Sequence, residues 1–492
     1  MKLNYSCLRG VLGRISLLGL GLAALPGCAQ ILGIESETTL VEAKCSGTLR
    51  VRITTDNSGL ATDVAPPYNY GVYDYLRYLN DTNGGIRGCP IDIDIKDTKY
   101  DSVMTETIID EWRQQPEWPT VSTLFIFGTG PTKLVAPKLM DEKKLIIPGS
   151  YAGMFDTPSS LSLDVNYPEI NSLGDMIVAT EKKESHGYPY LFFPATDYST
   201  GIRIGIQAAW KVRPGRIAMV HDSAGPCSFC VDPLAAGKSY VQLLPGMTLG
   251  PDLIVPQSSD PTQEASVTQV VKDYIQDEIN KKKMDSAYDP VRWLWAGNSL
   301  ISSTFIAKGA AEAQKLIDAA DLSSDWHLRV MANNWGIGET SASICMMNGP
   351  PGCADILYGL FPVPRYGDVQ NAEGMLTMME IHDTYRAEDG HMPSAYQDVR
   401  YVQGYAAALM WQAAVEKAID DGHTSPTGED LKNAFESFKD VDLQGMTAGR
   451  ISFTSKDHRP QANTAVYKIN SQNTLEFVDR YSIMLSPAWL GY

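Results

Sequence analysis

Two cysteines separated by two residues form the most reactive motif of the sequence, Cys227-Ser228-Phe229-Cys230. A pair with this spacing exchanges disulfides when one thiolate is activated at the first turn of a helix near the start of a small βαβ unit. Here the motif follows an expected strand, 216–221, by several loop residues and lies deep inside a long chain. We therefore interpret it as a disulfide that closes a loop, and keep an envelope thiol-disulfide enzyme as an alternative.

A glycine- and threonine-rich turn, Gly128-Thr129-Gly130-Pro131-Thr132, connects an expected strand to an expected helix. The backbone N–H groups of such a helix start, with the hydroxyls of Thr129 and Thr132, are suited to an anion such as a carboxylate. The turn lacks the Gly-Lys-Ser/Thr ending of a phosphate-binding loop, which disfavours a nucleotide. A purely structural role, in which the threonines cap the helix, remains open.

Other catalytic signatures are missing from the sequence. It contains no Gly-x-Ser-x-Gly and no His-Glu-x-x-His motif, and its seven histidines are scattered. We expect no enzyme activity, no cofactor and no metal. The net charge of −17, from 58 acidic and 41 basic residues, also disfavours nucleic acid as a partner.

The first residues have the composition of an export signal. Lys2, Arg9 and Arg14 precede the apolar run 15–25, which is shorter than the roughly 20 residues of a membrane-spanning helix. Leu25-Pro26-Gly27-Cys28 resembles the lipobox of bacterial lipoproteins, which implies lipidation of Cys28. We predict a signal peptide over 1–27, a tether over 28–44, and a location in the periplasm or cell envelope with a lipid anchor in a membrane.

Six cysteines remain in the mature chain after Cys28, an even number that favours disulfides outside the cytosol. Sequence alone allows about 15 connectivities. Close spacing favours Cys227 with Cys230 and Cys345 with Cys353, and elimination leaves Cys45 with Cys89. The last two precede the expected strands 48–54 and 91–95, whose starts meet at one sheet edge if the strands are parallel neighbours.

From residue 47 onward, strand-like and helix-like segments alternate, which predicts α/β units with right-handed crossovers and doubly wound sheets. The expected strands are 48–54, 91–95, 122–127, 145–147, 190–193, 216–221, 247–255, 293–296, 327–332, 449–453 and 464–469. The expected helices are 70–80, 106–115, 133–141, 201–211, 265–282, 305–319, 402–420 and 427–438, the last with Ser425 or Thr427 as N-cap. This number of strands favours two lobes.

The segment from Tyr78 to Gly88 contains Asn80-Asp81-Thr82-Asn83-Gly84-Gly85-Ile86-Arg87-Gly88, and Asp97-Thr98-Lys99-Tyr100-Asp101 follows the next strand. Together they resemble a stretch of the type I periplasmic solute-binding proteins, the branched-chain (leucine/isoleucine/valine) amino-acid-binding family. The resemblance covers about residues 47–469. It implies two doubly wound, Rossmann-like lobes with three hinge crossings: lobe 1 over 45–193 plus 362–445, and lobe 2 over 194–361 plus 446–492.

The resemblance also implies a ligand held between the lobes, beyond the carboxyl ends of the strands. Its matching positions give these candidate ligand-binding residues: Asn57, Ser58, Thr129, Thr132, Ser150, Tyr151, Tyr198, Ser199, Asn298, Ser299, Asn334 and Trp335. For each of them a capping or turn role is equally open.

The implied function is capture of a small polar ligand, of amino-acid, amide or carboxylate type, for an inner-membrane ABC permease. Amino-acid binders of the family hold the ligand ammonium with an acidic residue near the position of Asn334 and Trp335, and Glu339 lies nearby out of register. An amide offers no charge-assisted bond, so ammonium recognition stays open. A ligand-sensing receptor of the same fold is the alternative function.

Overall fold

The structure is a computed structural model that describes residues 45–222, 227–322, 325–347, 349 and 352–486. The described residues form one compact unit. The predicted signal peptide, lipidation site Cys28 and tether lie outside the described residues. Within the described part, no helix is both long and apolar enough to cross a membrane.

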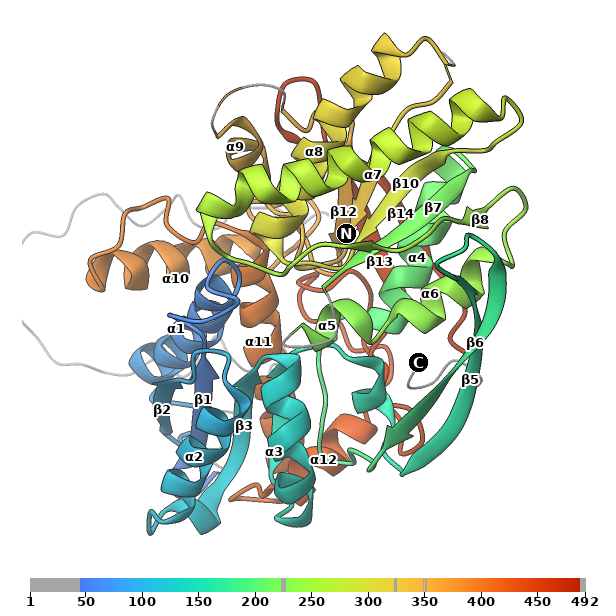
Figure 1. Cartoon of the computed structure of the whole chain (residues 1–492). Helices are drawn as coiled ribbons and strands as arrows, with labels where there is room; N and C mark the ends of the chain where they lie inside the picture. Colours follow the sequence, from blue (N-terminus) through green and yellow to red (C-terminus); the bar gives the residue numbers. More distant parts are fainter. Residues whose placement is uncertain (1–44, 223–226, 323–324, 348, 350–351, 487–492) are drawn as a thin grey trace, which may run out of the picture. The chain divides into compact units, whose positions relative to one another are not determined.

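The first half of the unit is built on a parallel sheet of four strands in the order β2-β1-β3-β4. The strands are β1 (Leu49–Thr55), β2 (Ile91–Asp97), β3 (Val121–Phe127) and β4 (Leu145–Gly149). Helices α1 (Ala65–Asn83), α2 (Ser102–Arg113) and α3 (Thr129–Asp141) alternate with them (Figure 1). Every residue of β3 is buried, as expected for a central parallel strand covered on both faces.

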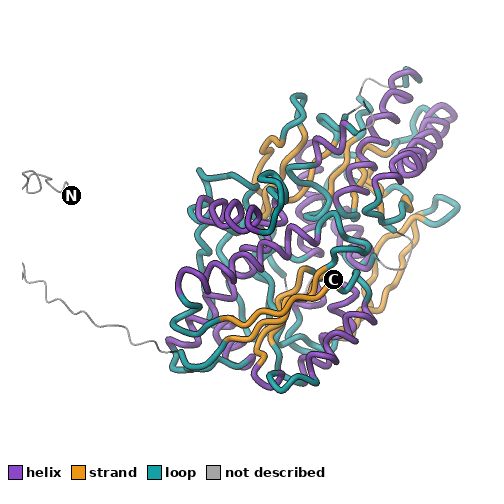
Figure 2. Tube along the Cα trace, turned by 90° about the vertical axis from the view of Figure 1, so that its left-hand side faces the viewer, coloured by secondary structure: helices purple, strands orange, loops and turns teal. Residues whose placement is uncertain are grey.

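The second half is built on an eight-stranded sheet in the order β14-β13-β12-β11-β10-β7-β8, with β9 also paired to β7. Its strands are β7 (Arg216–His221), β8 (Thr248–Leu249), β9 (Leu253–Ile254), β10 (Val291–Ala296), β11 (Arg329–Ala332), β12 (Leu357–Phe361), β13 (Asn463–Ile469) and β14 (Leu475–Ser482). Its helices are α4 (Tyr198–Val212), α5 (Ser228–Val231), α6 (Leu234–Val241), α7 (Glu264–Met284), α8 (Leu300–Ala319) and α9 (Ser341–Met346). Figure 2 shows the strands flanked by helices.

The chain passes between the two sheets more than once. After β12 it forms α10 (Met375–Glu388), α11 (Val399–Asp420) and α12 (Gly428–Glu436), and α11 packs along α1 of the first sheet. It then returns to the second sheet as β13, antiparallel to β12. Two lobes of mixed α/β structure with parallel sheets are therefore confirmed. The exact lobe limits predicted above stay a prediction.

The structure corrects three expected strands. Residues 190–193 form only a bridge between Leu191 and Ile146, because a turn at Tyr188 precedes the segment and Pro194 follows it. Residues 449–453 likewise give only the bridge Val441–Ile451. The expected strand 247–255 is split into β8 and β9 by Gly250-Pro251.

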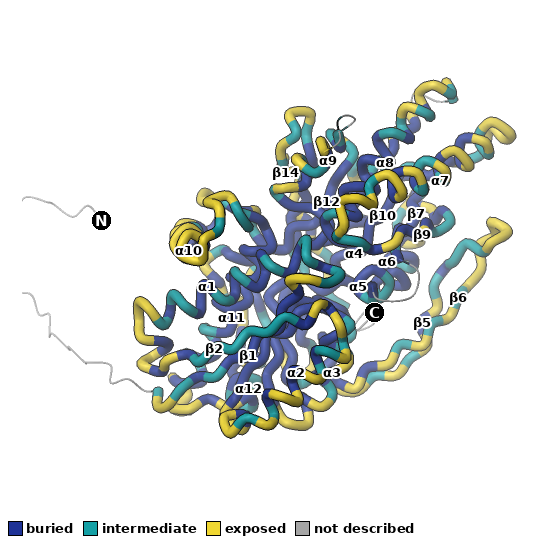
Figure 3. The backbone as a smooth tube through the Cα atoms, turned by 60° about the vertical axis from the view of Figure 1, so that its left-hand side comes forward, coloured by how far each residue is buried: buried dark blue, intermediate teal, exposed yellow. Residues whose placement is uncertain are grey.

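A hairpin that the sequence reading missed connects the two sheets. It consists of β5 (Leu161–Ile170) and β6 (Met176–Ser185), paired in antiparallel register along their whole length. Much of it is exposed, as Figure 3 shows. The helix α10 and the strands β12 and β14 were missed as well.

The six cysteines of the described residues form three disulfides, Cys45–Cys89, Cys227–Cys230 and Cys345–Cys353. These are the pairs that the spacing predicts. Cys45 and Cys89 lie at the starts of β1 and β2, which pair in parallel. Cys227 and Cys230 are 1% and 0% exposed, so the second disulfide offers no accessible sulfur for exchange chemistry.

Candidate functional site

Loops that leave the carboxyl ends of the strands in both lobes meet at one place. The first lobe contributes Thr129 after β3 and Ser150 after β4, whose hydroxyl oxygens are 2.6 Å apart. The second lobe contributes Trp335 after β11, whose indole Nε1 donates to the Tyr198 hydroxyl at 2.7 Å. In open α/β sheets this edge is where ligands bind, so we take the junction as the candidate site.

Aromatic rings dominate the junction. The Trp335 ring stacks on Tyr151 of the first lobe, with ring centroids 5.6 Å apart and an interplanar angle of 22°. Its edges face Tyr68 and Phe127 at centroid distances of 5.8 and 5.9 Å. Such offset and edge contacts add to the free energy of burying the rings. A single buried apolar cluster therefore extends from the first lobe into the second.

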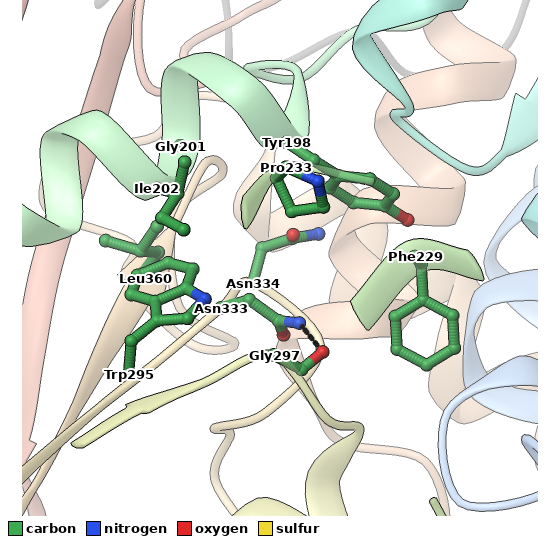
Figure 4. A pocket seen from close by; sticks show the side chains of 10 residues that line it. All are labelled: Tyr198, Gly201, Ile202, Phe229, Pro233, Trp295, Gly297, Asn333, Asn334 and Leu360. Carbon is green, nitrogen blue, oxygen red and sulfur yellow. Dashed lines mark hydrogen bonds between the residues drawn. The ribbon is translucent and has the colours of Figure 1, made fainter. Parts of the chain in front are cut away.

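Two small cavities flank this aromatic contact, each with a volume of about 10 Å³. Tyr198 and Phe229 line both of them. The first-lobe cavity is also lined by Tyr100, Phe127, Thr129 and Trp335, and the second-lobe cavity by Trp295, Asn333 and Asn334 (Figure 4). A drug-sized ligand needs roughly 300 Å³ or more, so binding requires the lobes to separate from this arrangement.

The candidate residues fall into two groups. Thr129, Tyr198, Asn334 and Trp335 line the cavities, while Ser150 and Tyr151 lie directly behind them. The others have local partners. Asn57 and Ser58 are exposed and bind the Asp97 carboxylate, the Thr132 hydroxyl donates to the Gly128 carbonyl at 2.7 Å, and the Asn298 amide donates to the Val255 carbonyl at 3.3 Å.

Ser199 faces a different space, a polar pocket of about 290 Å³ between the hairpin and the start of α4. Charged side chains line this pocket, and those of Lys133 and Asp232 form an ion pair of 2.5 Å across it. The side chains of β6 that face the pocket are also charged. Ser199, which was expected to contact the ligand, therefore does not lie in the aromatic junction.

Ser299, at the start of α8, is engaged by the first lobe. Its hydroxyl donates to the Asp63 carboxylate at 2.8 Å, and the backbone N–H of Ile301 donates to the same oxygen at 2.9 Å. The carboxylate therefore occupies the N-terminal end of a 20-residue helix, where negative charge is favoured. Loss of solvent outweighs these hydrogen bonds and raises the pKa of Asp63 to about 6.

Glu339, the acidic residue nearest the expected ammonium position, accepts hydrogen bonds from backbone N–H groups instead. Its carboxylate accepts from the N–H of Tyr366 at 2.6 Å and from the N–H of Val399 at 2.7 Å. Burial, reinforced by the neighbouring Asp398, raises the pKa of Glu339 above its ordinary value. It is not among the described residues that line the two cavities.

Four aromatic side chains that line the cavities, Tyr100, Phe127, Phe229 and Trp295, were not among the predicted ligand-binding residues. Phe229 lies between Cys227 and Cys230, a segment that the sequence analysis interpreted only as a loop closed by a disulfide. Trp295 was part of an expected strand, and its position at the carboxyl end of β10 was the available signal. Within the part of the chain that the structure describes, no cluster of three or more His, Cys, Asp or Glu side chains could hold a metal ion.

The comparison with known families agrees with this geometry. A family model described as "Periplasmic binding protein" matches residues 48–272 and 330–474. The chain belongs to this family. A search of curated proteins finds no match.

Solved structures of periplasmic binding proteins share the fold. An ABC transporter substrate-binding protein from Aeropyrum pernix is 21% identical, with a TM-score of 0.67 over 89% of this chain and 96% of that one. A branched-chain amino acid ABC transporter protein from Thermus thermophilus with bound valine is 15% identical, with a TM-score of 0.65 over 90% and 98%. A solute-binding protein from R. palustris in complex with benzoate is 14% identical, with a TM-score of 0.62 over 91% and 99%.

Proposed function

We propose that this periplasmic binding protein captures a small molecule between its two lobes and presents it to an ABC permease of the inner membrane. The observation that carries the proposal is the meeting of strand-end loops from both lobes at one junction, where the Trp335 ring of one lobe stacks on Tyr151 of the other. Lobe separation would open this junction, and closure around a ligand would bury the ligand there.

The proposal includes export and anchoring. Cys28 is the proposed lipidation site, so that the residues after it tether the binding unit to a membrane of the cell envelope. A chain tethered in this way stays close to a membrane permease without a spanning helix of its own. The proposed lobes are residues 45–193 with 362–445, and 194–361 with 446–492.

Binding rather than catalysis is the activity that the junction supports. Hydroxyl, amide and indole groups of Thr129, Tyr198, Asn334 and Trp335 surround the cavities, and they offer hydrogen bonds and ring contacts. The proposed ligand is a small molecule of the amino-acid, amide or carboxylate type. Valine and benzoate, each bound in a structure of this fold, are both within that range.

A thermal-unfolding screen over amino acids, amides, and aliphatic and aromatic acids tests the proposal. A ligand present at about 100 times its Kd is expected to raise the free energy of unfolding by about 2.7 kcal/mol. The variant Trp335→Ala removes the ring that both lobes share and should lose that stabilisation. The variant Trp210→Ala removes a ring whose Nε1 donates to the Pro245 carbonyl and should retain it. A broad screen without any stabilising compound would refute the proposal.

A further inference from the structure

One buried hydrogen-bond donor in the second-lobe cavity has no acceptor among the residues that the structure describes. Trp295 is 1% exposed, and its indole Nε1 makes no hydrogen bond within that part of the chain. Figure 4 shows this nitrogen turned toward Asn333 and Asn334. A buried N–H without a partner is unfavourable, so an acceptor atom of a ligand beside Trp295 would remove that cost.

The space around this donor is apolar. The side chains of Ile202, Phe229, Pro233 and Leu360 line the cavity with the Trp295 ring. Phe229 also reaches the first lobe, where its ring meets the edge of Tyr100 at a centroid distance of 6.5 Å. The junction thus already holds a benzyl group between the lobes, which indicates the size and chemistry that it accommodates.

The charges around the cavities limit which polar group a ligand can carry beside its apolar part. Among the described residues that line either cavity there is no Asp, Glu, Lys or Arg. Carboxylates near the junction are already engaged within the protein, Glu339 by two backbone N–H groups and Asp63 by the start of α8. Asp56 likewise accepts from the N–H groups of Gly59 and Ala61, and Asp197 from the N–H of Thr200. A ligand ammonium closed into this space would lose its hydration without gaining a carboxylate, which is strongly unfavourable.

An anionic or neutral oxygen of a ligand is more favourable in the junction than an ammonium group. In the second-lobe cavity the Trp295 N–H and the Asn334 amide can donate, and in the first-lobe cavity the Thr129 hydroxyl can donate. Hydrogen bonds from neutral donors stabilise a carboxylate even where no cation is present.

We infer that the junction takes a monocarboxylic acid with an apolar body of about the size of a benzyl or isobutyl group and without an ammonium group. One carboxylate oxygen accepts from Trp295 Nε1, and the apolar body lies between Tyr100, Tyr198 and Phe229. This inference rests on the proposed function and narrows its ligand class from amino acids, amides and carboxylates to the last of these.

Isothermal titration calorimetry with two matched pairs of probes tests the inference. 3-Phenylpropionate and L-phenylalanine differ only by the ammonium group, as do 4-methylpentanoate and L-leucine. We expect at least one of the two deaminated acids to bind, and to bind at least about tenfold more tightly than its amino acid, since even about 1.4 kcal/mol of unpaired charge has that effect.

Two variants make the test specific to the indole N–H. Trp295→Phe keeps an aromatic ring and removes the donor, and should weaken binding of the acid about fivefold or more. Trp326→Phe is the matched control, because Trp326 is equally buried in the same lobe and its Nε1 donates to the Val291 carbonyl at 2.8 Å. The control should leave the affinity unchanged, even if both variants unfold at a lower temperature.

The outcomes separate this inference from the proposed function. Equal or tighter binding of the amino acids, or unchanged affinity in Trp295→Phe, overturns the inference and leaves a solute-binding protein. Binding of other compounds of the screen, but of neither acid, overturns it as well. Only the failure of every compound in the screen overturns the proposed function together with the inference.

Discussion

At the scale of single residues, Asp63 is the clearest link between the lobes. It lies on the first lobe just before α1, yet its hydrogen bonds are to Ser299 and Ile301 of the second. Beside it, the Thr62 hydroxyl donates to the Ser259 hydroxyl of the second lobe at 2.8 Å. These contacts can form only when the lobes approach each other, so they stabilise the closed arrangement.

The raised pKa of Asp63, about 6, gives this contact a pH dependence. Between about pH 4 and pH 6 the folded protein keeps a proton that the unfolded chain has released, so the stability contributed by the group falls as the pH rises through this window. Asp63→Asn does not titrate there. We expect the free energy of unfolding of the wild type, minus that of Asp63→Asn, to fall with rising pH by less than about 1.4 kcal/mol per unit.

Urea unfolding of both proteins from about pH 4 to about pH 8 measures this difference. A difference that stays constant or increases across the window would contradict the account of Asp63.

At the scale of elements, a buried lysine of the second lobe holds the hairpin β5–β6 through an ion pair. The Lys238 ammonium on α6, 4% exposed, donates to Glu169 of β5 and to Asp252 at 2.6 Å. Burial lowers the pKa of Lys238, but Asp252 and Glu169 outweigh burial and raise the pKa above its ordinary value. The lysine is therefore charged at neutral pH and neutralises two partly buried carboxylates.

Removing that charge should destabilise the fold markedly. Lys238→Met keeps the length of the side chain, leaves Glu169 without this cation and leaves Asp252 with the His221 ring at 3.3 Å, which we expect to lower the free energy of unfolding by about 2–4 kcal/mol. Lys182→Met is the control, because Lys182 pairs with Glu184 on the exposed strand β6, with side chains 63% and 64% exposed. An exposed pair contributes about 0–1 kcal/mol. Equal losses in the two variants would show that the hairpin is not anchored through Lys238.

At the scale of the whole molecule, the alternation of buried parallel strands with helices was enough to predict two doubly wound lobes. It failed for the exposed hairpin and for the edge strand β14, and it also missed β12, a short, fully buried strand inside the second sheet. The hairpin strand β6 is rich in charged residues, and β14 closes the edge of the second sheet, so neither has the continuous apolar run of a buried strand. The N-cap of α12 was left open between two residues, and the structure assigns it to Thr427 in a capping box with Asp430.

The candidate site was predicted only in part, for a physical reason. The positions matched through the family resemblance, most of them in loops after strands, include Thr129, Tyr198, Asn334 and Trp335, which line the cavities. Matched positions do not show which side chain in a loop points inward. Asn57 and Ser58 follow β1 directly but turn to Asp97, whereas Phe229 enters the junction from a loop that a disulfide closes.

The central claim is that the two lobes close over a ligand at the aromatic junction. Small-angle X-ray scattering with and without saturating 3-phenylpropionate tests it most directly, with binding verified by calorimetry on the same sample. We expect the ligand-free protein to include a more open form and its radius of gyration to decrease when the acid binds. Scattering curves that coincide although the site is saturated, or a radius that increases on binding, would contradict the claim.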